Sequence, residues 1–165
     1  MGTVTAPWKQ LLLNALESNA HLKHSSYFQL ATIGSNGRPS NRTVVFRGFQ
    51  DNSDKIQINT DGHTRKIEEL KHCPFAEICW YFTDTWEQFR INGRIDIING
   101  SNPDSLKLQQ REKSWFAGPV DAFYLLVLDP DQIDYLNLKS NQRLTFNSRL
   151  SASGEKSWTS ERINP

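Results

Sequence analysis

Cysteine, charge of one sign and long apolar runs are all scarce in this sequence, and each scarcity excludes a class of protein. The two cysteines, Cys73 and Cys79, are too few for a disulfide framework or a structural zinc site. The 19 basic and 18 acidic residues nearly cancel, which argues against a nucleic-acid-binding surface. Apolar runs such as 124–128 are far too short to cross a membrane, and the N-terminus lacks a signal-peptide pattern. We therefore expect a cytoplasmic protein that binds neither nucleic acid nor membrane.

The remaining composition favours a small globular protein without a metal. The four histidines do not follow the spacing of a metal-binding motif, so no metal site is predicted. A chain of 165 residues is expected to form a single domain, residues 1–165. Only 37% of the residues are hydrophobic, which fits a thin sheet or barrel that buries further surface against a partner.

Alternation of apolar and polar residues dominates the chain and predicts a mainly β fold with flanking helices. Strands are expected at 27–33, 42–49, 55–60, 75–82, 86–98, 123–128, 133–138, 143–147 and 156–163. Helices are expected at 7–20, capped by Thr5, at 64–71 and at 103–115. The Asn36-Gly37 pair predicts a hairpin turn between the first two strands. Six or more antiparallel strands with few helices predict a small barrel, because closure removes exposed sheet edges.

The predicted helix at 64–71 begins with cations where acidic residues are usually preferred. Thr64 is its expected N-cap, so Arg65 and Lys66 lie at the positive end of the helix dipole. This arrangement is favourable if a phosphate accepts hydrogen bonds there from the backbone, the Thr64 hydroxyl and both cations. The alternative, which this stretch alone favours, is a solvated basic pair whose charge is offset by Glu68 and Glu69.

A second basic pair, Arg42 and Arg47, shifts the balance toward a phosphate ligand. The residues between them would span about 16 Å in an extended strand, at roughly 3.3 Å per residue. That length is close to the reach of flavin mononucleotide (FMN) from its phosphate to its ring. The odd spacing places the two side chains on opposite faces of a regular strand, so a bulge or an approach from two sides is expected. The alternative is a pair of surface arginines whose stems lie along a strand edge.

Three motifs together resemble the flavin-binding core of the pyridoxamine 5′-phosphate oxidase family. They are "NRTVVFRGF" at 41–49, "NTDGHTRK" at 59–66 and "WEQFRINGRI" at 86–95. The closing "WTSERINP" at 158–165 is similar to that family's C-terminus, and the motifs follow the family's order. The resemblance implies an FMN-binding split β-barrel that forms a homodimer with FMN at the subunit interface.

The resemblance also implies a set of site residues. The cofactor-binding residues would be Arg42, Thr43, Val44, Val45, Phe46, Arg47, Asn59, Thr60, Thr64, Arg65, Lys66 and Gln88. Arg42 and residues 64–66 would lie at the phosphate, and Arg47 would be the catalytic residue near the reactive N5 edge of the ring. Gln88 would hydrogen-bond the pyrimidine edge of the ring. The position of Gln88 on the polar face of its strand independently favours that role, because an amide both donates and accepts.

The substrate side departs from the family's oxidase pattern. Leu136, Thr145 and Asn147 stand where an aromatic residue, a histidine and an arginine are usual. Arg143 remains of an arginine–histidine pair, so Arg47 and Arg143 are the expected substrate contacts. The connection at 115–121 is also short for the family.

These observations predict an FMN-dependent oxidoreductase in which hydride passes from a small amine or alcohol to flavin N5, with the true substrate left open. The alternative is a flavin-binding protein without turnover that serves storage or sensing. A third possibility, a nucleic-acid-binding barrel that uses Arg90 and Arg94, is weakened by the balanced charge.

Overall fold

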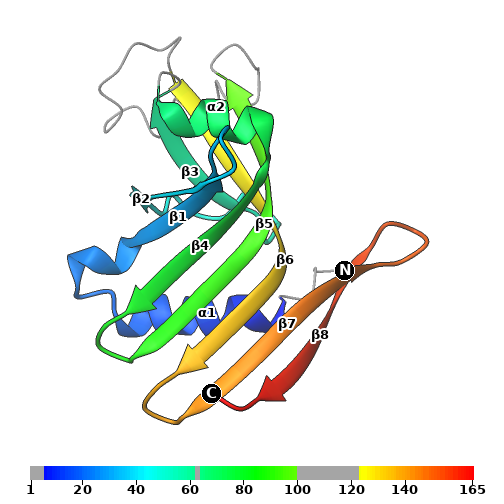
Figure 1. The fold of residues 1–165 in the computed structure, drawn as a ribbon. Coiled ribbons are helices and arrows are strands. Elements are labelled where there is room, and N and C mark those ends of the chain that lie inside the picture. Colours follow the sequence, from blue (N-terminus) through cyan, green and yellow to red (C-terminus); the bar gives the residue numbers. More distant parts are fainter. Residues whose placement is uncertain (1–5, 62–63, 100–122) are drawn as a thin grey trace.

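Among the residues that the structure describes, 6–61, 64–99 and 123–165 of a computed structural model, eight antiparallel strands form one sheet (Figure 1). The strands are β1 Tyr27–Ile33, β2 Pro39–Val45, β3 Ile56–Asp61, β4 Phe75–Phe82, β5 Glu87–Asn99, β6 Phe123–Asn137, β7 Gln142–Leu150 and β8 Lys156–Ile163. The same residues form the helices α1 Pro7–Ser18 and α2 Arg65–His72 and the short 3-10 helix η1 Lys23–Ser26. The prediction of a mainly β fold with flanking helices is confirmed.

The sheet closes into a barrel at the corner that follows β2. The strands lie in the order β2-β1-β4-β5-β6-β7-β8, and β3 pairs with the first half of β6. The N–H of Arg47 donates to the Gln57 carbonyl at 3.1 Å, and the N–H of Gln57 donates to the Gly48 carbonyl at 2.9 Å. These bonds join the end of β2 to β3, so β1 to β6 surround a common core. The hairpin of β7 and β8 extends beyond this barrel (Figure 1).

Alternation along the strands fills the barrel with apolar side chains. On β5, Phe89 and Ile91 are fully buried whereas Arg90 and Arg94 are exposed, as the sequence predicts. Trp80 lies at the centre of an aromatic cluster in which its ring is 4.9 Å from that of Phe28. Helix α2 covers one end of the barrel, and α1 lies toward the other end (Figure 1). Each helix contributes fully buried side chains, among them Trp8, Leu12 and Ile67.

Most predicted elements are confirmed, and the strands at 27–33, 75–82 and 156–163 match to the residue. Helix α1 ends at Ser18 rather than residue 20, and its N-cap position is Ala6, without a side-chain capping bond. The predicted cap Thr5 and the predicted helix at 103–115 lie outside the described residues. None of the described helices has both the length and the apolar character needed to span a membrane.

Several strand predictions are wrong in their limits by more than one residue. The strand predicted at 143–147 is too short, because β7 covers Gln142–Leu150. The strand predicted at 42–49 begins at Pro39, because the hairpin turn closes directly onto the Ile33–Pro39 pair, and ends at Val45, where the chain turns the barrel corner. The strands predicted at 123–128 and 133–138 are one strand, β6. A bulge opposite Asn92 and Gly93 accommodates Pro130, whose missing N–H would interrupt a regular ladder.

Gly93 is predicted to be essential for this bulge. A Cβ atom at residue 93 would lie 2.3 Å from the backbone carbonyl oxygen of Asp129, a contact that only a backbone shift relieves. Gly93→Ala should therefore lower the free energy of unfolding by about 1–3 kcal/mol, as overpacking does. Urea denaturation would measure the loss, and Ser157→Ala on the exposed face of β8 is the control. Equal stability of both variants would contradict the close approach.

Candidate functional site

The basic start of α2 lies where the sequence predicts it. Helix α2 begins at Arg65, with Thr64 at the N-cap position in an extended conformation. The Thr64 hydroxyl makes no capping bond to the helix and lies 3.4 Å from the Thr60 hydroxyl at the end of β3. Arg65 is exposed and Lys66 is half-buried. Three predicted site segments, the end of β3, the N-cap and the first helical turn, are thus held together.

Arg42 joins the same region through a buried ionic network. Its side chain turns toward the inside of the barrel end, where one terminal nitrogen donates to Glu69 Oε1 at 2.8 Å. The other terminal nitrogen donates to the Leu30 carbonyl at 3.1 Å and to the Thr32 hydroxyl at 2.7 Å. Because Glu69 belongs to α2, this network ties β2 and β1 to the helix whose first turn carries Arg65 and Lys66.

The corner after β2 explains the odd spacing of Arg42 and Arg47. Residue 46 still bonds the β1 side, since its N–H donates to the Ser26 carbonyl at 2.8 Å, whereas Arg47 bonds β3. The backbone therefore leaves one sheet edge for another between the two arginines, and regular alternation does not apply. The odd spacing in the sequence predicts a bulge or an approach from two sides. The structure needs no bulge, because Arg42 lies within β2 and Arg47 lies after its end.

Asn59 presents a buried amide that has no partner within the described part of the chain. Neither its Nδ2 nor its Oδ1 is exposed or hydrogen-bonded to any of the residues that the structure describes. Leaving a buried donor and acceptor unpaired costs about 1–3 kcal/mol, so such groups usually have a ligand or water as partner. Asn59 lies one residue before Thr60 on β3, next to the start of α2.

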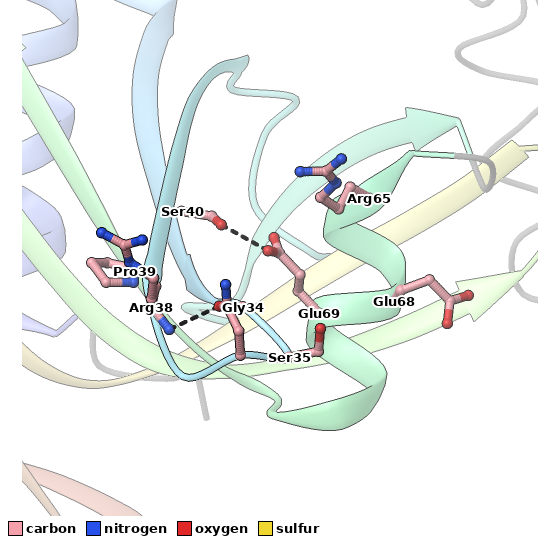
Figure 2. Close-up of a pocket in the computed structure, with 9 residues that line it drawn as sticks. Gly34, Ser35, Arg38, Pro39, Ser40, Arg65, Glu68 and Glu69 are labelled. Atoms are coloured by element: carbon pink, nitrogen blue, oxygen red, sulfur yellow. Dashed lines mark hydrogen bonds between the residues drawn. The ribbon is translucent and has the colours of Figure 1, made fainter.

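A cavity of about 520 Å³ lies between α2 and the β1–β2 hairpin (Figure 2). Figure 2 shows Arg65, Glu68 and Glu69 on the helix side of this space, with the hairpin residues opposite. The Ser40 hydroxyl donates to Glu69 Oε2 at 2.7 Å across it. The cavity therefore combines two guanidinium groups, Arg38 and Arg65, with two carboxylates in a polar setting beside the Arg42 network.

Gln88 and Arg143 stand apart from this group. The strand register puts Gln88 beside Tyr81, and Tyr81 falls level with Tyr27 and Val45 when the β1–β4 pairing is continued. Gln88 is therefore level with the end of β2. It lies three strands away from β2 in either direction around the barrel, which is a path of about 14 Å at roughly 4.8 Å per strand. Its Oε1 lies 3.7 Å from the thiol of Cys79.

Arg143 forms an ion pair with an acidic neighbour, Asp134. Its Nε and one terminal nitrogen donate to the two oxygens of Asp134, at 3.0 Å and 2.5 Å. The hydrogen bond with Asp134 and the charge of that carboxylate raise the pKa of the Arg143 guanidinium. Arg90 extends this array, since it lies 3.9 Å from Asp134 and 3.1 Å from Glu77. Two cations and two anions thus balance one another on the outer face of the sheet.

Sequence reasoning missed the central role of Glu69. It was expected only to offset the charges of Arg65 and Lys66, yet its carboxylate is buried and accepts three hydrogen bonds, from Thr32, Ser40 and Arg42. The available signal was its position between Ile67 and Leu70 on the apolar side of the helix, where a charged residue requires a partner. Within the described ranges, no group of three or more His, Cys, Asp and Glu side chains is arranged to hold a metal ion.

Comparison with known families identifies the same relationship as the motifs. The model of the family described as "Pyridoxamine 5′-phosphate oxidase, FMN-binding domain" matches residues 5–99. A protein of Arabidopsis thaliana called pyridoxine/pyridoxamine 5′-phosphate oxidase 2 is 60% identical over the full length of both chains. That alignment has 198 positions against the 165 residues of this chain, so 33 positions of the relative have no counterpart here. The short connection predicted at 115–121 lies outside the described residues.

Solved structures share the fold over nearly the whole chain. A pyridoxamine 5′-phosphate oxidase-related, FMN-binding protein of Nostoc punctiforme is 34% identical, with a TM-score of 0.84 over 99% of this chain and 100% of its own. PhzG of Burkholderia lata, crystallised with tetrahydrophenazine-1-carboxylic acid, has a TM-score of 0.72 over 98% of this chain and 94% of its own. At 18% identity the latter shows the fold alone. The predicted split-barrel fold is confirmed.

Proposed function

The chain belongs to the pyridoxamine 5′-phosphate oxidase family, and from this premise we propose that it is an FMN-dependent oxidoreductase acting on a small amine or alcohol. The observation that carries the proposal in this chain's own structure is the buried amide of Asn59, which lies beside the basic start of α2 and has no hydrogen-bond partner among the described residues. A bound flavin nucleotide offers both the acceptor and the donor that this amide lacks. The residues present therefore fit the cofactor.

The chain's residues divide into two functions toward FMN. Arg42 and residues 64–66 hold the phosphate, while the backbone of 43–46 lines the ring and orients it. When bound, FMN supplies the ring nitrogen N5 that accepts a hydride from the substrate. Arg47 follows the corner that places it beyond the end of β2, and its guanidinium stabilises negative charge that develops at the ring.

The proposed site is completed by a second copy of the chain. Gln88 lies on the barrel wall opposite β2, so one flavin ring cannot reach both from within a single chain across a packed core. The outer face of β1 and β4 also exposes four large apolar side chains, Tyr27, Ile33, Phe75 and Tyr81. An apolar set of this kind on one sheet face marks a protein interface. A homodimer with FMN between the subunits accounts for both observations.

The substrate side favours a partner with little negative charge. Arg143 and Asp134 neutralise each other, and Thr145 offers a hydroxyl that lies 3.5 Å from the Glu161 carbonyl. A phosphate dianion needs several fixed donors, which these residues do not provide. The Arabidopsis relative's name makes pyridoxamine and pyridoxine 5′-phosphates the first substrates to test. We expect the chain to oxidise them slowly.

The phosphate assignment is tested by the double substitution Arg65→Ala, Lys66→Ala. Each charge-assisted contact is worth roughly 1.5–3 kcal/mol, so losing both should weaken FMN binding by more than about a hundredfold while the barrel remains folded. Flavin absorbance per protein after gel filtration measures the loss, and circular dichroism checks the fold. Lys71→Ala, in the last turn of the same helix, is the matched control. Full flavin occupancy in the double variant would remove the phosphate assignment.

The shared site is tested by complementation between two defective variants. When the Arg65→Ala, Lys66→Ala chain is refolded with a Gln88→Ala chain, random pairing should restore about a quarter of the tight flavin sites. Each mixed dimer then holds one intact site and one doubly defective site. Fluorescence titration of FMN counts the tight sites, and each variant refolded alone is the control. No recovery in the mixture, or a monomer that keeps its flavin, would contradict a site between subunits.

The substrate proposal is tested by oxygen consumption with pyridoxamine 5′-phosphate and pyridoxine 5′-phosphate. We expect turnover well below about 1 s⁻¹, the low end of ordinary enzymatic rates. An FMN-saturated preparation whose colour bleaches with dithionite and returns in air shows that the flavin is competent. Turnover of either compound at an ordinary rate would show that Arg143 and its neighbours suffice for a phosphorylated substrate. Bleaching of the flavin by a trial amine or alcohol would separate an oxidoreductase from a storage protein.

A further inference from the structure

The most unusual charge in the described structure is the carboxylate of Glu69. Its side chain is only 5% exposed, although it lies in the middle of the short helix α2. Three donors from the barrel reach it: the Thr32 hydroxyl at 2.8 Å, the Ser40 hydroxyl at 2.7 Å and Arg42 at 2.8 Å. A buried carboxylate persists only with such partners, because desolvation otherwise neutralises it.

These partners keep Glu69 ionised at neutral pH. The hydrogen bond from Ser40 lowers the pKa of the carboxyl group, burial opposes this, and Thr32 and Arg42 lower the pKa further. Arg65 and Glu68 on α2 and Arg38 on the hairpin are further charged groups that line the adjoining cavity. Glu69 thus presents a fixed negative charge to Arg42 from the helix side.

Arg42 is held by Glu69 in two ways. One terminal nitrogen donates directly to Glu69 Oε1. The other donates to the Thr32 hydroxyl, whose own proton is directed to the same Glu69 oxygen, so that Thr32 relays the constraint. A guanidinium has five N–H groups, and its bonds to the described residues occupy three of them. The Nε–H and one terminal N–H make no bond to the described residues, and the three bonds fix the direction in which these two groups can donate to an anion.

We propose that Glu69 is a positioning residue that aims the Arg42 guanidinium at the FMN phosphate. This inference rests on the proposed function, since it assigns Glu69 to the phosphate end of the FMN site. Glu69 neutralises the charge of Arg42, so the pair offers directed donors rather than net charge. Loss of the carboxylate adds net positive charge, but it releases both the direct contact and the Thr32 relay. The loss of direction outweighs the gain in charge.

The test compares FMN with riboflavin, which has the same ring and lacks the phosphate. In Glu69→Gln, the preference for FMN over riboflavin should fall roughly tenfold, the value of one charge-assisted hydrogen bond, while riboflavin affinity stays unchanged. A general packing defect would weaken both ligands equally. Glu68→Gln is the matched control, because Glu68 lies on the same helix and lines the same cavity but is exposed. That variant should keep the wild-type preference.

Two further variants show that Glu69 acts through Arg42. In an Arg42→Ala background, Glu69→Gln should cause no additional loss of FMN preference. Thr32→Val should lower the preference in the same direction, and it serves as the test if Glu69→Gln does not fold. An unchanged or increased preference for FMN in folded Glu69→Gln overturns the role of Glu69 but leaves the phosphate site standing. If Glu69→Gln does not fold, the same result in Thr32→Val overturns that role. A wild-type protein that binds both flavins equally overturns the phosphate site and this inference together.

Discussion

Closure of the barrel at residues 46–49 is the constraint on which the rest of the structure depends. Arg47, Gly48 and Gln57 exchange two backbone hydrogen bonds there, and these bonds turn an open sheet into a barrel around the Trp80 cluster. Closure also decides which residues share a site. It places Arg42, Asn59 and the start of α2 at one region of the barrel, and it sends Gln88 to the opposite wall. Local backbone bonding at one corner thus underlies our proposal that a second subunit completes the site.

Much of the fold was predictable because it depends on local patterns. The strands β1, β4 and β8 were predicted to the residue, since runs of strand-forming residues there are bounded by polar or turn-forming segments. The first-turn cations of α2 were predictable for a similar reason, because an N-cap and its first turn lie within a few residues of sequence. The split barrel and the FMN site needed the joint resemblance of several motifs, which no single stretch carried.

What escaped prediction depends on contacts between distant residues. Glu69 was seen as a surface acid because its partners Thr32, Ser40 and Arg42 lie 27 to 37 positions away. The single strand β6 was predicted as two strands, 123–128 and 133–138, because the bulge that accommodates Pro130 is set by the partner strand at Gly93. The ion pair between Arg143 and Asp134 likewise could not be predicted without the register in which β6 pairs with β7. Such features follow from topology, which periodicity does not encode.

Charge is organised differently on the two sides of the proposed site. On the outer face of β4 to β7, the ions pair within the chain, and Glu77, Arg90, Asp134 and Arg143 leave almost no net charge. At the start of α2, Arg65 and Lys66 stand against the positive end of the helix dipole, an arrangement that an anion relieves. Glu69 does not reverse this, because its carboxylate is buried, paired with Arg42 and engaged by three donors. In the site that we propose, the chain therefore concentrates its capacity for a dianion at the cofactor end, and it leaves the substrate end to shape and hydrogen bonding.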